Sequence, residues 1–169
     1  LKELDDAEAR LRAECARLDT LALKLGDRTR YGELLADLAR LVPAEDPQLV
    51  KWNRKLAAFD QELAALRAKI APPDSESRVT VAKRAEYLPV LTDLKVYLDE
   101  GDRDLVRWSD KLESAGGRVA KLREDVAAVV GLQPDAIGKP KQDQIAAKLA
   151  DYEALAGADD AQLKDWKGA

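Results

Sequence analysis

The sequence predicts an all-α protein, an elongated antiparallel helical bundle or short solenoid of two-helix repeats of about 57 residues with coiled-coil-like heptad seams. Three observations lead to this class. First, 46% of the 169 residues are apolar, 36% are charged and 5% are aromatic, a composition that suits amphipathic helices better than strands. Second, apolar residues recur in steps of three and four along extended segments. Third, Trp52, Trp108 and Trp166 recur at intervals of 56 and 58 residues, which indicates a repeat.

The repeat becomes visible when the three tryptophans are aligned without gaps. Seven positions then agree in identity or in apolar character across all three copies. They are Tyr31, Leu35, Asp37, Leu38, Asp46, Leu49 and Trp52 in copy one; Tyr87, Leu91, Asp93, Leu94, Asp102, Leu105 and Trp108 in copy two; and Ile145, Leu149, Asp151, Tyr152, Asp160, Leu163 and Trp166 in copy three.

Each copy begins with a segment whose apolar periodicity predicts an amphipathic helix of about three turns. A proline or glycine then breaks the helix, and an aspartate stands at the expected N-cap of the next one. The short loop between them favours an antiparallel pair. The short helices are expected at 31–42, 87–98 and 143–156, the breaks at Pro43, Gly101 and Gly157, and the caps at Asp46, Asp102 and Asp160.

The second helix of each copy carries a heptad seam, since its apolar residues alternate in steps of three and four. A similar seam, with Glu8 as its exception, predicts one long helix at the start of the chain. The seams are Leu49, Trp52, Leu56, Phe59, Leu63, Leu66 and Ile70; then Leu105, Trp108, Leu112, Ala115, Val119, Leu122, Val126 and Val129; and, at the start, Leu1, Leu4, Leu11, Cys15, Leu18, Ala22 and Leu25.

We therefore expect one helical repeat array over residues 1–169. It would comprise the long helix of a truncated copy at 1–26, copy one at 31–70, copy two at 87–130 and a truncated copy three at 143–169. Linkers are expected at 71–83 and 131–141, because both contain helix-stopping prolines. Since methionine is absent, even from position 1, we expect the chain to be a piece of a longer protein.

The tryptophans allow two interpretations, ligand-binding residues or wedges in the core. Tryptophan is enriched at binding interfaces. However, Trp52, Trp108 and Trp166 lie on the heptad seams, which normally face partner helices. We predict that all three are core residues. Cys15 also lies on a seam and is expected to be a buried structural thiol rather than a reactive one.

Two further features recur or stand out on the helices. Asp37, Asp93 and Asp151 recur on the short helices and are expected to pair with a Lys or Arg of the neighbouring unit rather than to bind a metal. Gly116 and Gly117 fall inside the second long helix, at a cost of about 2 kcal/mol relative to alanine. They predict a kink that serves as a hinge or the close approach of a neighbour, with sequence drift as the alternative.

The inventory of residues argues against most function classes. The chain has no histidine and no glycine-rich phosphate loop, so we predict no catalytic residues, no metal and no cofactor. The net charge of −4 and the pI of about 5.1 disfavour nucleic acid, and no apolar run is long enough for membrane insertion. A single cysteine slightly favours the cytoplasm. The expected function is a protein–protein interaction or spacer module, a scaffold-like fragment; a homo-oligomerising assembly module is the alternative.

Overall fold

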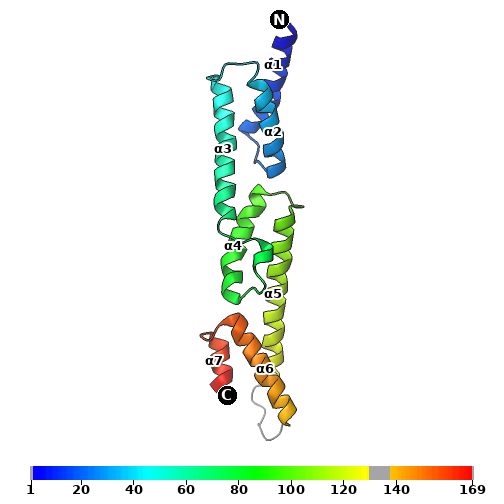
Figure 1. Cartoon of the computed structure of the whole chain (residues 1–169), viewed down its shortest axis with the longest axis vertical. Helices are drawn as coiled ribbons and strands as arrows, with labels where there is room; N and C mark the ends of the chain where they lie inside the picture. The colour runs from blue at the N-terminus through cyan, green and yellow to red at the C-terminus, as the bar shows by residue number, and fades with distance from the viewer. Residues whose placement is uncertain (1, 130–137, 169) are drawn as a thin grey trace. The chain divides into compact units, whose positions relative to one another are not determined.

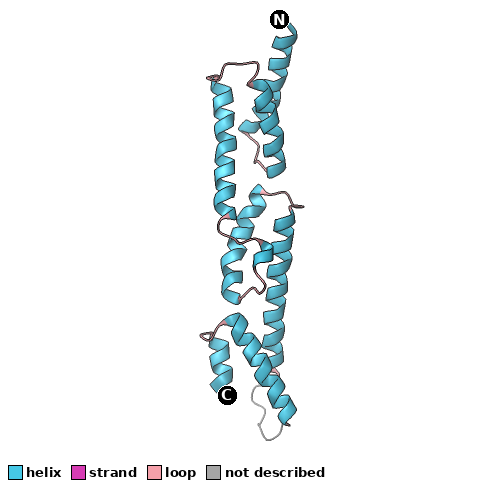
Figure 2. Ribbon diagram, in the orientation of Figure 1, coloured by secondary structure: helices cyan, strands magenta, loops and turns pink. Residues whose placement is uncertain are grey.

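A computed structural model describes residues 2–129 and 138–168 of the chain. Within these ranges all regular secondary structure is helical, which confirms the predicted all-α class (Figure 2). The chain divides into two compact units, described separately below. Unit 1 comprises Leu1–Ile70 and Thr92–Leu105, and unit 2 comprises Ala71–Leu91 and Val106–Ala169.

Unit 1 is built around the helices α1 (Lys2–Cys15), α2 (Leu25–Leu38) and α3 (Pro47–Arg67), with α2 packed against both of the others (Figure 1). A short 3₁₀ helix, η1 (Ala16–Asp19), connects α1 to the segment before α2 and contacts α3. The end of α4 (Val81–Tyr97) completes the unit.

Unit 2 contains the 3₁₀ helix η2 (Pro73–Ser75), the first part of α4, most of α5 (Arg103–Ala127), α6 (Lys139–Ala156) and α7 (Ala161–Gly168). The helices α6 and α7 pack against each other (Figure 1). One cluster of its core joins α5, α6 and α7, and it consists of the buried residues Val119, Val126, Tyr152, Leu155, Leu163 and Trp166.

The heptad spacing correctly predicts which residues of α3 and α5 are buried. Every seam position within α3 is buried, and within α5 only Leu122 is half-buried; outside these helices Ile70 and Val129 are half-buried. The buried residues are Leu49, Trp52, Leu56, Phe59, Leu63 and Leu66 in α3, and Leu105, Trp108, Leu112, Ala115, Val119 and Val126 in α5.

The long helix expected over 1–26 is wrong. The helix α1 ends at Cys15, η1 follows, and Leu25 begins α2 instead of ending α1. Two contacts explain the break. The Asp27 carboxylate accepts a hydrogen bond from the Lys24 amide at 3.3 Å, which fixes the start of α2. The Lys55 ammonium binds the carbonyls that η1 and its exit leave without helical partners.

The other boundaries also move. The short helices begin earlier than expected, α2 at Leu25 and α4 at Val81, and α3 ends at Arg67, so the linker predicted at 71–83 shifts to 68–80 without a change of length. The Thr80 hydroxyl accepts from the Lys83 amide at 3.2 Å and caps α4. Residues 131–137 of the linker predicted at 131–141 lie outside the described residues, and its last three residues are helical instead, since α6 begins at Lys139. Gly157, with φ of +92°, ends α6 as predicted, in a conformation that glycine adopts readily.

Candidate functional site

The three tryptophans are buried, with exposed fractions of 2% for Trp52, 2% for Trp108 and 9% for Trp166. This confirms that they are core residues. The indole nitrogen of Trp52 donates to Asp19 Oδ1 at 3.0 Å, and that of Trp108 donates to the Ala71 carbonyl at 2.9 Å. In each case the acceptor belongs to the segment that precedes the unit's short helix. The tryptophan therefore joins the apolar seam to that connecting segment.

An aromatic partner supports two of the indoles edge-on. The rings of Tyr87 and Trp108 lie 5.0 Å apart, and those of Tyr152 and Trp166 lie 5.1 Å apart. Such edge-to-face pairs stabilise by about 0.5–1.5 kcal/mol beyond their buried area. When the tryptophans are aligned, Tyr152 falls seven positions after the position of Tyr87, which is about two helical turns.

A lysine three residues after the tryptophan binds the same connecting segment. The Lys55 Nζ donates to the carbonyls of Leu18 and Leu21, the latter at 3.0 Å. Similarly, the Lys111 Nζ donates to the carbonyls of residues 73 and 76. An ammonium suits this task because its three donors reach carbonyls that no backbone amide satisfies.

The residue before the tryptophan adds an ion pair to an aspartate of that segment. Lys51 pairs with Asp19 at 2.8 Å, and Arg107 pairs with Asp74. The pairing with Lys51, together with the indole hydrogen bond, lowers the pKa of Asp19 below its ordinary value.

A second recurring site lies at the N-caps of the helices that carry the tryptophans. The three predicted caps are confirmed where the structure shows their hydrogen bonds. Asp46 Oδ1 accepts from the amides of Gln48 and Leu49 at 3.1 and 3.0 Å. Asp102 caps the amides of residues 104 and 105 in the same way, and Asp160 accepts from the amide of Leu163 at 3.0 Å.

Each of these capping aspartates also faces an arginine from the preceding long helix; we call these contacts the Arg–cap pairs. Arg12 pairs with Asp46 at 2.7 Å, Arg67 with Asp102 at 3.9 Å, and Arg123 with Asp160 at 4.0 Å. These arginines follow Leu11, Leu66 and Leu122, so a Leu-Arg dipeptide recurs at intervals of 55 and 56 residues.

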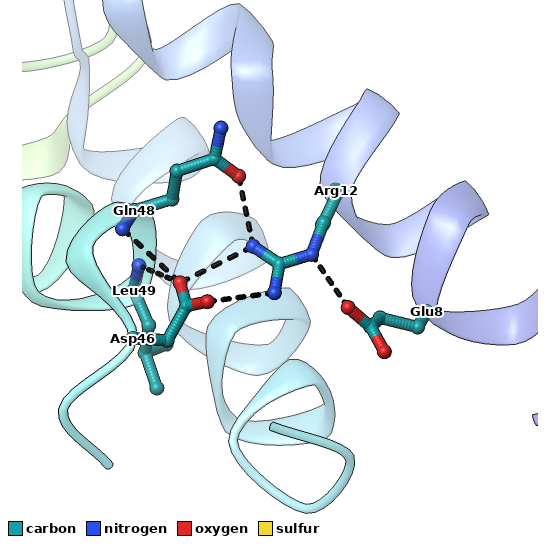
Figure 3. Close-up of polar contacts among 5 residues, drawn as sticks. All are labelled: Glu8, Arg12, Asp46, Gln48 and Leu49. Atoms are coloured by element: carbon teal, nitrogen blue, oxygen red, sulfur yellow. Dashed lines mark hydrogen bonds and ion pairs between the residues drawn. The ribbon is translucent and has the colours of Figure 1, made fainter. Parts of the chain in front are cut away.

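The Arg12–Asp46 pair has the closest geometry (Figure 3). The guanidinium uses Nη2 to bind Asp46 Oδ2 at 2.7 Å and Nη1 to reach Oδ1 at 3.2 Å, while Nε binds Glu8 at 2.7 Å. Gln48 Oε1 accepts from Nη1 at 2.8 Å. The guanidinium and the Leu49 amide lower the pKa of Asp46 from 3.8 to about 2.

The third pair uses a tyrosine as an intermediary. Arg123 Nε donates to the Tyr152 hydroxyl at 2.8 Å, and that hydroxyl donates to Asp160 Oδ1 at 3.2 Å. The hydroxyl therefore connects α5, α6 and the start of α7. The hydrogen bond to Tyr152 raises the pKa of Arg123, so the arginine stays charged.

The aspartates expected to bridge neighbouring units do not all behave as predicted. Asp37 pairs with Arg40 at 3.1 Å, three residues along its own chain segment, so the prediction is wrong for this residue. The reason is proximity, since residues three apart on a helical turn already face each other. Asp93 and Asp151 make no ion pair with any residue that the structure describes.

Asp93 instead lines a shallow groove of about 360 Å³ in unit 1, between α3 and the end of α4. Val96 stands in this groove with 60% of its surface exposed. The Tyr97 hydroxyl donates to Glu62 Oε2 at 2.6 Å on the same surface. The groove is lined by Glu62, Ala65, Leu66, Lys69, Asp93, Val96 and Tyr97.

Gly116 and Gly117 lie inside α5, which continues through them. A Cβ atom at Gly116 would lie 3.0 Å from the Arg84 guanidinium, whereas one at Gly117 would meet nothing within 4 Å. The close approach of a neighbour, one of the predicted alternatives, is therefore confirmed for Gly116. A hinge at this position stays a prediction.

Cys15 is fully buried, and burial raises the pKa of its thiol. This agrees with a structural role. In the described ranges, no group of three or more His, Cys, Asp or Glu side chains is arranged to hold a metal ion. The same part of the chain contains no helix with the length and apolar character needed to cross a membrane.

Comparisons with known proteins return no match to this chain among protein families, curated proteins or solved structures.

Proposed function

We propose that the chain is a non-catalytic segment of a helical repeat array, with coiled-coil-like seams, that serves as a protein–protein interaction or spacer module of a larger protein. The observation that carries this proposal is the threefold recurrence of the Arg–cap pairs at the spacing of the tryptophans. Contacts that recur at the sequence period are what nearest-neighbour packing in a repeat array requires.

The distribution of apolar and charged residues supports the same proposal. The tryptophans and most seam residues are buried, so the seams serve internal packing. The ion pairs occupy the outer helix faces, and most of their side chains are substantially exposed. A module that binds proteins would use these charged faces, and a spacer would need them only for solubility.

Small-angle X-ray scattering tests the array. A compact chain of this length has a radius of gyration of about 15 Å, and a linear array should give a clearly larger value. The matched variants are Arg12→Gln, which removes an Arg–cap pair, and Arg10→Gln, which changes an exposed arginine on the same helix. A wild-type radius near 15 Å would rule out an array.

Self-association is the second candidate, and one feature favours it. The groove exposes the apolar side chain of Val96 and is also lined by Lys69 and Asp93, so two copies could pair opposite charges across it. Light scattering over a hundredfold dilution distinguishes the candidates. Self-association predicts a mass that falls on dilution and a monomer for Val96→Asp, whereas a constant monomer mass supports the first proposal.

A further inference from the structure

Two arginines occupy equivalent positions in the two units. Arg28 lies three residues before Tyr31, and Arg84 lies three residues before Tyr87, the tyrosines with which the aligned positions of copies one and two begin. Across from them, the long helices carry different residues at the position eight after the tryptophan. Copy one has Asp60 there, and copy two has Gly116.

In unit 1 the arginine is neutralised by the aspartate. Arg28 Nε binds Asp60 Oδ1 at 2.8 Å, and Nη2 binds Oδ2 at 2.7 Å, a two-point contact. Because a planar guanidinium matches the two oxygens of a carboxylate, such contacts are among the strongest exposed ion pairs. The pair joins α2 to α3 and lowers the pKa of Asp60.

In unit 2 the cation is retained but its acid is missing. Arg84 Nε donates to the Leu112 carbonyl at 2.9 Å, and the guanidinium lies over Gly116. No carboxylate among the described residues lies within ion-pair distance of Arg84, and neither of its terminal Nη groups has a described hydrogen-bond partner. The four N–H donors of the two Nη groups on this half-buried guanidinium therefore remain available.

An exchange of glycines accounts for part of this arrangement. In unit 1 a glycine on the arginine's own helix, Gly32, makes room for the guanidinium, since a Cβ there would lie 2.6 Å from Arg28 Nη1. Copy two has Leu88 at that position, and its glycine is Gly116 on the opposite helix. The exchange explains where the Arg84 guanidinium lies. Because Gly116 stands at the position of Asp60, the same exchange removes the acid and leaves Arg84 without that partner, whereas it does not account for Gly117, where a Cβ would meet nothing within 4 Å.

We propose that Arg84 and the glycine pair Gly116–Gly117 form a binding site for a carboxylate, an Asp or Glu side chain of a partner protein, which supplies the acid that Asp60 supplies within unit 1. The identity of the carboxylate's source rests on the proposed role in protein–protein interaction. The space at Gly116 holds the Arg84 guanidinium, whereas the open space at Gly117 allows a partner's backbone to come close to α5. Carboxylate is favoured over phosphate because the equivalent arginine already holds one.

The test is a titration of the full chain with a hexaglutamate peptide, followed through the guanidinium NMR signals of Arg84 and Arg28. We expect a saturable shift of the Arg84 signals and none of the Arg28 signals. Arg84→Gln and Gly116→Asp should each weaken binding by roughly tenfold or more, the first by removing the donors and the second by supplying the acid internally.

The matched control is Asp60→Gly, which should open a second site and make the Arg28 signals respond to hexaglutamate. Inorganic phosphate is the competing probe. Saturation by phosphate without saturation by hexaglutamate would overturn the assignment to carboxylate, and equal affinity in wild type and Arg84→Gln would overturn the site itself. A compact radius of gyration together with a responsive Arg84 would contradict the array and leave this site standing.

Discussion

Replacing Trp108 with alanine or phenylalanine separates what its ring packing and its hydrogen bond contribute to the stability of unit 2. Its indole fills the core with 2% exposure, packs edge-on against Tyr87, and donates to the Ala71 carbonyl at 2.9 Å. Truncation to alanine removes all three interactions and leaves a cavity. Buried Trp→Ala substitutions cost about 3–5 kcal/mol. We expect Trp108→Ala to lower the free energy of unfolding by that amount.

Trp108→Phe is the informative partner variant. It retains a ring opposite Tyr87 but loses the hydrogen bond to Ala71, which stabilises by about 1 kcal/mol, and part of the buried volume. We expect a loss of about 2 kcal/mol, between the wild type and the alanine variant. Urea unfolding followed by far-UV circular dichroism measures both variants without depending on the removed fluorophore. A loss below about 1 kcal/mol for Trp108→Ala would show that the indole is not a core wedge.

Three other predictions follow from local contacts. The folded-state pKa of Asp46, about 2, lies below the ordinary value of 3.8. The ionised carboxylate therefore stabilises the fold above pH 3.8, and this stabilisation is lost as the pH falls towards 2. The urea midpoint should drop less steeply between pH 5 and pH 2 in Asp46→Asn than in the wild type. Gly117→Ala should stabilise by up to about 1 kcal/mol in thermal unfolding because its Cβ enters open space, whereas Gly116→Ala should gain less because its Cβ meets Arg84; equal gains would contradict the close approach. Cys15 should react with Ellman's reagent in the unfolded chain and much more slowly in the folded one, because burial raises its pKa and blocks access; equal rates would contradict its burial.

The helical class, the N-caps and the buried seams of α3 and α5 follow from the sequence because each depends on local chemistry. The seam predicted at the start of the chain is wrong, since Leu4 is 58% exposed. An aspartate two or three residues before free helical amides is recognisable without knowledge of the fold, as Asp46 shows. The end of α1 is different. Apolar residues continue the heptad spacing through Leu18 to Leu25, and the helix stops because Lys55, 37 residues from Leu18, takes the released carbonyls. Periodicity contains no information about such a distant partner.

The Arg–cap pairs are a second feature that the sequence alone does not predict. The Leu-Arg dipeptide recurs visibly with Arg12, Arg67 and Arg123. However, an arginine on a charged helix face cannot be distinguished in the sequence from a solvated one. Only the fold shows that an N-cap lies beside it. The hydroxyl of Tyr152 in the third pair was even less predictable, because its copy moves the aromatic residue to a different position.

Apolar residues at heptad spacing do not by themselves determine how far one helix is shifted along the next, and the polar contacts do. If a helix slides by seven residues, its seam positions again receive apolar residues, so the apolar pattern alone does not determine the register. Such a slip moves the helix by about 10 Å. It would take Arg12 out of reach of Asp46, which it now contacts at 2.7 Å, and would separate the Trp108 indole from the Ala71 carbonyl.

Ion pairs made by partly exposed arginines, as in the Arg–cap pairs, usually add little to stability individually. Their contribution is therefore best understood as selection among registers of nearly equal apolar burial, as polar residues do in coiled coils. The tryptophans act in the same direction, because α3 and α5 each have one indole, and a slip of seven residues would bring Phe59 or Ala115, neither of which can donate, to its position. Removing Arg12 should consequently broaden the NMR signals of α1 through exchange between registers more than it lowers the unfolding free energy.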